Sequence, residues 1–228
     1  MIEKVAATAT RPQAARSGCI GVVSYTSQTT WFSQILAGIE EALTQSHASL
    51  WLSSLLQGDR YDAGAVLDWI RTQPHLDAEK VLIQGGSYGG YLALSAAANY
   101  NDRISATLSY LGPTSLILQL ENDLLPADEI REEYGDERDH RIRTFLERIA
   151  PLNNSQKIKK PVFIIQGKND RRVPYKAGEQ MTAALKKQGT PVWYLLAVDE
   201  GHGFASPGTY EYMFLAKVVF AQTHLLSR

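Results

Sequence analysis

The chain has 228 residues, 44% of them apolar, and a formal net charge of −1, which predicts one compact domain over residues 1–228 with a core of its own. Without a basic surplus to neutralise phosphates, nucleic acid is not an expected partner. No apolar stretch approaches the roughly 18 residues of a membrane span, and no apolar run follows an N-terminal basic cluster, so we expect a cytoplasmic protein without a membrane anchor or secretory signal.

Strand-like and helix-like segments alternate after a small, polar stretch at residues 1–17, which predicts a flexible arm. Short apolar runs rich in β-branched residues predict buried strands at 19–26, 48–56, 80–87, 106–112, 161–167 and 191–198. Apolar residues at helical spacing predict helices at about 30–46, from Asp59 as N-cap onward, and at 91–100, 176–189 and 209–226. Residues 113–158 are charged and helical in pattern and predict an excursion from the sheet, or a partial cap.

This alternation of strands and helices defines the expected fold class. Repeated strand–helix–strand units give parallel strands joined by right-handed crossovers. Uniformly apolar strands indicate that helices cover both faces of the sheet. We therefore predict a three-layer α/β fold with a mostly parallel sheet of about six strands.

The predicted strand at 80–87 ends in Gly85-Gly86-Ser87-Tyr88-Gly89-Gly90, which matches the nucleophile-elbow pattern G-x-S-x-G. In that pattern the serine occupies a strained turn between a strand and a helix, and small neighbours let the two backbones approach. The turn exposes the serine hydroxyl and places the N–H of Tyr88 at a helix N-terminus, where it can stabilise an oxyanion. Ser87 is therefore the candidate nucleophile.

Two more candidates follow the last two predicted strands. Asp170 comes just after the strand at 161–167, and His202 lies in the glycine-flanked loop after the strand at 191–198. The order Ser87, Asp170, His202 is the chain order that α/β-hydrolases require, and it predicts a catalytic triad with His202 as base and Asp170 as the residue that orients it. No histidine is spaced for metal binding with cysteine or carboxylates, so no metal or other cofactor is expected.

From about residue 59 onward, the chain resembles the catalytic domain of the prolyl oligopeptidase family of serine peptidases. The resemblance lies in GGSYGGYLAL, GKNDRRVP and DEGHGF, together with EEYGD and IAPLNN. It implies an α/β-hydrolase fold in which Ser87, Asp170 and His202 occupy the family's triad motifs.

Residues 1–58 contain the segments ARSGCIGVV, WFSQILAGIEEAL and SLWLSSLL. These segments resemble the first strand, helix and strand of the ligand-binding core of LacI-type transcription regulators, which would make the chain a hybrid. We expect the N-terminal propeller and the HGGP-type oxyanion loop of the prolyl oligopeptidase family to be absent. The second oxyanion donor would then come from the SYTSQTT loop, from the N–H of Tyr25 or Thr26.

Three functions follow from these features. The leading hypothesis is a carboxylesterase that cleaves small or short-chain acyl esters through an acyl-enzyme, because ester cleavage tolerates an imperfect oxyanion hole. The alternative is a prolyl-oligopeptidase-like peptidase acting on short peptides, and the third is a non-catalytic protein that binds a small molecule. Apolar surface left uncovered in the hybrid also predicts homo-oligomers.

Overall fold

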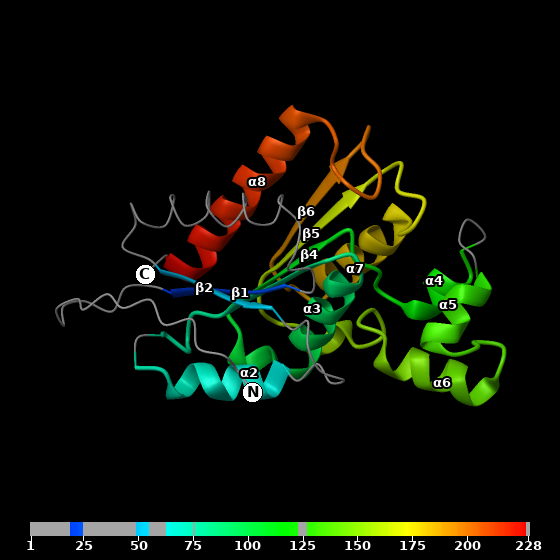
Figure 1. Cartoon of the computed structure of the whole chain (residues 1–228), viewed down its shortest axis with the longest axis horizontal. Coiled ribbons are helices and arrows are strands. Elements are labelled where there is room, and N and C mark those ends of the chain that lie inside the picture. The colour runs from blue at the N-terminus through cyan, green and yellow to red at the C-terminus, as the bar shows by residue number, and fades with distance from the viewer. Residues whose placement is uncertain (1–18, 25–48, 55–62, 75, 123–126, 227–228) are drawn as a thin grey trace.

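The computed structural model describes residues 19–24, 49–54, 63–74, 76–122 and 127–226, where short strands alternate with helices (Figure 1). The strands are β1 (Cys19–Ser24), β2 (Ser49–Ser54), β3 (Leu82–Gly86), β4 (Ala106–Tyr110), β5 (Val162–Gly167) and β6 (Val192–Ala197). The α-helices are α2 (Ala63–Thr72), α3 (Tyr88–Asn99), α4 (Leu116–Leu120), α5 (Ala127–Tyr134), α6 (His140–Ile149), α7 (Tyr175–Lys187) and α8 (Pro207–Ala221). Shorter helical turns are η1 (Asn101–Arg103), η2 (Ser155–Lys157) and η3 (Gln222–Leu226).

Several expected features lie outside the described residues. They are the arm at 1–17, the helix at about 30–46, the N-cap Asp59, and the oxyanion candidates Tyr25 and Thr26.

Every strand pair formed by the described elements is parallel. The strands β3, β4, β5 and β6 form a four-stranded sheet in that order, and β1 pairs with β2. Because β1 also lies beside β3, β2 lies on the far side of β1 from this sheet. The parallel order brings the carboxyl ends of β3, β5 and β6 to one edge, which is where ligands bind in open α/β sheets.

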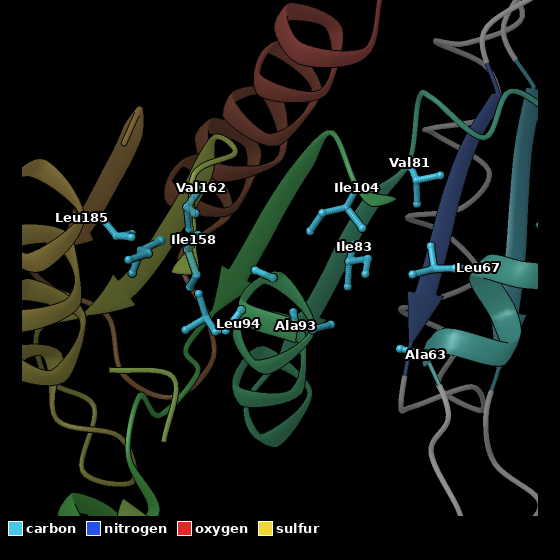
Figure 2. Close-up of a cluster of buried hydrophobic side chains, with 14 of the residues drawn as sticks. Ala63, Leu67, Val81, Ile83, Ala93, Leu94, Ile104, Ile158, Val162 and Leu185 are labelled. Carbon is cyan, nitrogen blue, oxygen red and sulfur yellow. The ribbon is translucent and has the colours of Figure 1, made fainter. Parts of the chain in front are cut away.

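The alternation of side chains along β5 shows why the fold has three layers. All six of its residues are buried. Val162 and Ile164 pack with α2, α3 and α7 in one core cluster, whereas Phe163 and Ile165 pack with α8 in a second cluster on the opposite face. Figure 2 shows the first cluster, which includes Leu94 of α3, Leu185 of α7 and Val162 of β5. The expected α/β-hydrolase-type fold with helices on both faces is confirmed.

Residues 113–158 leave the sheet, as expected from their charged pattern, and contain α4, α5 and α6 (Figure 1). These helices enclose a small apolar cluster with Tyr91 of α3, formed around Leu116, Leu120 and Leu146. The segment therefore packs against the start of α3, close to Ser87. Its role as a cap over the site stays a prediction.

Most element boundaries differ from those expected by one or two residues, and two differ by more. The helix after β3 begins at Tyr88 rather than at residue 91, because the two glycines that follow Tyr88 form its first turn. The last α-helix ends at Ala221, and a wider turn of helix, η3, continues it to Leu226. Gly189 follows the C-cap of α7 with a φ of 79°, a conformation that glycine adopts readily and that commonly ends a helix.

Candidate active site

Ser87 lies in a strained turn between β3 and α3. Its φ of 53° is in the left-handed region that residues other than glycine rarely adopt. The backbone is held there by a 2.8 Å hydrogen bond from the Ser87 N–H to the carbonyl of Tyr110 on the neighbouring strand. The turn leaves Ser87 exposed at the carboxyl edge of the sheet, in the geometry that the elbow pattern predicts.

Glycines allow α3 to begin this close to the sheet. A β carbon on Gly85 would collide with the carbonyl group of Gly89, one turn into the helix. Likewise, a β carbon on Gly90 would lie 2.8 Å from the α carbon of Gly112, just after β4. Both positions therefore exclude side chains, and the sharp elbow depends on them.

Asp170 follows β5 and is held rigidly in the loop before α7. Its Oδ1 accepts hydrogen bonds from the backbone N–H of Arg172 at 2.8 Å and of Val173 at 2.9 Å. Its Oδ2 lies 2.7 Å from Nδ1 of His202. One carboxylate oxygen is thus fixed by the backbone, which leaves the other to orient the imidazole.

His202 lies in the loop that follows β6, here called the His202 loop (residues 199–206). The carboxylate of Glu200, which is 3% exposed, accepts hydrogen bonds from the N–H of Ala205 at 2.9 Å and of Ser206 at 3.1 Å. The side chain of Ser206, together with the backbone N–H groups of Ala205 and Ser206, holds the pKa of Glu200 below its ordinary value, so the buried side chain remains an anion that accepts these donors. Glu200 thereby closes the loop on itself around His202.

The three side chains meet at the edge of the sheet. His202 Nε2 lies 2.9 Å from Ser87 Oγ, and His202 Nδ1 lies 2.7 Å from Asp170 Oδ2. The Asp170 side chain is fully buried, whereas 17% of the His202 side chain is exposed. With Nδ1–H donated to the carboxylate, Nε2 can accept the hydroxyl proton of Ser87. This arrangement can activate a serine for attack on a carbonyl carbon.

The residues that support the site could not be found from motifs alone. Gly167 at the end of β5 lies against the backbone of Glu200, Glu200 closes the His202 loop, and Tyr110 contacts both Ser87 and that loop. Of these supporting residues, Gly167 alone has a signal in the sequence, because a glycine at a strand end is typical of a close approach between two backbones.

Aromatic rings pack together at the start of α3, the helix that follows Ser87. Tyr88 stacks on Tyr91 with a centroid distance of 5.9 Å and on Tyr134 of α5 with a centroid distance of 5.4 Å. As the first residue of α3, Tyr88 also has its backbone N–H at the helix N-terminus directly after Ser87. This is where the oxyanion donor is expected.

The described histidines other than His202 have structural contacts. His140 starts α6 and hydrogen-bonds Thr144, and His224 packs against Phe220 with a centroid distance of 4.6 Å. His47 and His75 lie outside the described residues. Among the residues that the structure describes, no three His, Cys, Asp or Glu side chains are grouped so that they could hold a metal ion. No helix in that part of the chain is long and apolar enough to cross a membrane.

A parallel sheet covered on both faces, with a serine, a histidine and an aspartate hydrogen-bonded in series at its carboxyl edge, defines the serine hydrolases of the α/β-hydrolase type. Within that class, the chain belongs to the prolyl oligopeptidase family, whose pattern it matches over residues 51–228. The match begins slightly before residue 59, where the resemblance was expected to start. The expected LacI-type resemblance of residues 1–58 stays a prediction.

Curated relatives carry peptidase names. The chain is 33% identical over 150 residues to dipeptidyl aminopeptidase BIII of Pseudoxanthomonas mexicana, an alignment that covers 62% of this chain and 21% of that protein. It is 27% identical over 184 residues to the acylamino-acid-releasing enzyme of Mus musculus, with 73% of this chain and 24% of that protein covered. The chain therefore spans about a quarter or less of the length of these relatives.

A solved structure shares the fold. A puromycin-hydrolyzing peptidase of Mycobacterium tuberculosis superposes with a TM-score of 0.78 at 22% identity, over 95% of this chain and 36% of that chain. At this identity the likeness supports the fold alone.

Proposed function

We propose that the chain acts as a serine peptidase on short peptides or aminoacyl amides, through an acyl-enzyme on Ser87. The observation that carries the proposal is the hydrogen-bonded series from Ser87 through His202 to Asp170, in a member of the prolyl oligopeptidase family. Ser87 attacks the carbonyl carbon, His202 takes the hydroxyl proton and returns it to the leaving amine, and Asp170 fixes the tautomer of the imidazole.

The substrate class follows from the relatives and from the surroundings of Ser87. The names of the relatives concern dipeptides and acylated amino acids, which supports amide substrates over the short-chain esters expected first. The partly exposed ring of Tyr88, the residue directly after the nucleophile, offers an apolar wall at the start of α3, backed by the buried ring of Tyr91 and by the ring of Tyr134. Such a wall favours an aromatic or large apolar side chain on the acyl side of the scissile bond.

Amide cleavage places a strict demand on the oxyanion hole, because each donor is worth roughly 100- to 1,000-fold in rate. The N–H of Tyr88 is one proposed donor, at the N-terminus of α3. The second donor is proposed at Tyr25 or Thr26. The carboxylesterase hypothesis would be favoured if this second donor were lost, since activated esters tolerate its loss better.

A substrate panel tests the proposal. Aminoacyl, dipeptidyl and N-acylaminoacyl p-nitroanilides are assayed beside p-nitrophenyl butyrate, each with the parent chain and with Ser87→Ala prepared in parallel. We expect hydrolysis of at least one anilide with an apolar acyl residue at rates at least 100-fold above the Ser87→Ala variant. Turnover of the ester alone, with every anilide at the level of Ser87→Ala, would instead identify an esterase.

A further inference from the structure

Tyr110, the last residue of β4, contacts both the Ser87 turn and the His202 loop, through different atoms. Its backbone carbonyl accepts the 2.8 Å hydrogen bond from the N–H of Ser87. Its phenol oxygen accepts a 3.2 Å hydrogen bond from the N–H of Phe204, two residues after His202. No motif includes Tyr110, and it touches none of the reacting atoms.

Packing holds the Tyr110 ring in place between these two bonds. Its ring meets that of Phe204 edge to face, with centroids 5.5 Å apart and planes at 76°. A β carbon on Gly86 would lie 3.3 Å from the Tyr110 ring, so the ring also packs against the strand that carries Ser87. Lys217 of α8 places its ammonium 4.3 Å from the ring centre. The phenol therefore has little freedom to move away from the Phe204 N–H.

The His202 loop has a separate anchor on the side of Asp170. The N–H of Asn169 donates a 2.8 Å hydrogen bond to the carbonyl of Glu200, which fixes the loop relative to the end of β5. That bond ties the loop to the residue directly before Asp170. The Tyr110 bond fixes the other side of the loop relative to β3 and β4, which carry the Ser87 turn.

We propose that Tyr110 is a positioning residue that sets the distance between His202 and Ser87 by tying the His202 loop to the Ser87 turn. The inference rests on the proposed function, in which His202 takes the proton of Ser87. Without the phenol oxygen, the N–H of Phe204 loses its acceptor in a largely buried place, and the loop relaxes away from the sheet. The 2.9 Å approach of His202 to Ser87 then becomes a minor population.

The test compares two tyrosines on opposite faces of the same sheet. Tyr110→Phe removes only the phenol oxygen and keeps both the ring and the backbone carbonyl. Tyr194→Phe on β6 is the matched control, because the hydroxyl of Tyr194 is buried without a hydrogen-bond partner in the described structure and packs in the other core cluster. Three quantities are measured for each variant: kcat and KM on the best anilide, the rate at which a fluorophosphonate labels Ser87, and Tm.

We expect Tyr110→Phe to lower kcat and the labelling rate together by roughly five- to fiftyfold, with KM within about twofold of the parent value. Its Tm is expected to fall by roughly 2–8 °C, because the N–H of Phe204 loses its acceptor, whereas Tyr194→Phe retains parental kcat, labelling rate and Tm. The proposal is wrong if Ser87 is labelled at the parental rate in Tyr110→Phe. It is also wrong if Tyr194→Phe lowers kcat and the labelling rate by as large a factor as Tyr110→Phe does. A parent chain that cleaves no anilide would refute the peptidase function alone, since labelling of Ser87 still reports the pairing with His202.

Discussion

The carbonyl oxygen of Glu200 lies 2.7 Å from the point where a β carbon would stand on Gly167. This contact joins the end of β5, which leads to Asp170, to the loop that carries His202. Any side chain at residue 167 would push the two segments apart, because the neighbouring atoms are backbone and cannot rotate away. The Asp170–His202 hydrogen bond of 2.7 Å therefore depends on a glycine at this position.

Gly167→Ala is accordingly expected to lower kcat at least tenfold and the free energy of unfolding by about 1–3 kcal/mol. Gly208→Ala in the first turn of α8 is the control, because its β carbon would meet open space. That variant should keep parental kcat and unfold at equal or slightly higher urea concentration. Parental activity in Gly167→Ala, measured in the same anilide and urea series, would show that the loop does not need this close approach.

Asp170→Asn tests the role of the buried carboxylate. The amide oxygen of asparagine can still accept the N–H groups of Arg172 and Val173, so the loop should keep its shape. Its amide nitrogen would then face Nδ1 of His202 and favour the tautomer in which Nε2 carries the proton and cannot accept one from Ser87. We expect kcat to fall roughly 10⁴-fold, as in other triads, with little change in Tm. A loss below tenfold would remove Asp170 from the proposed mechanism.

Lys217 gives the folded chain a distinct dependence on pH. Burial lowers the pKa of its ammonium to about 8, below the roughly 10.4 of an unfolded lysine. Burying the protonated ammonium therefore lowers the free energy of unfolding. This destabilisation is fully present below pH 8 and disappears as the pH rises from about 8 to about 10.4. Lys217→Met should raise the free energy of unfolding at pH 7 by about 1–2 kcal/mol, because the side chain is only partly buried and its contact with Tyr110 offsets part of the cost.

The measurement is urea unfolding at pH 7 and near pH 10, where the gain should shrink towards zero. Lys186→Met, on the exposed side of α7, is the control and should change the free energy by less than about 0.5 kcal/mol at both pH values. An equal gain for Lys217→Met at both pH values would mean that this ammonium is not desolvated in the folded state.

The fold was accessible from the sequence because its signals are local. Apolar runs such as VFII of β5 predict buried parallel strands, and a glycine-rich turn after β3 predicts the strained serine. The chain order of Ser87, Asp170 and His202 then predicts that three strand ends converge. The sequence pattern predicts a start for α3 three residues after the observed one, because glycines in its first turn hide its helical pattern.

The supporting contacts were not accessible, because they join segments far apart in the chain. Tyr110 and Phe204 are 94 residues apart, and nothing around either residue indicates that a phenol meets a backbone N–H. Glu200 is part of the DEGHGF motif, yet its hydrogen bonds to Ala205 and Ser206 depend on the folded path of the loop. The triad motifs likewise do not separate ester from amide substrates, since the same triad performs both reactions.

Labelling with a fluorophosphonate, followed by intact-mass spectrometry and peptide mapping, tests the central claim that His202 activates Ser87 as a nucleophile. The account predicts a single adduct at Ser87, no adduct in Ser87→Ala, and labelling of His202→Ala slowed by at least about 100-fold, since the pair works as a unit. An adduct at another residue, or turnover by Ser87→Ala above about a hundredth of the parental rate, would contradict it.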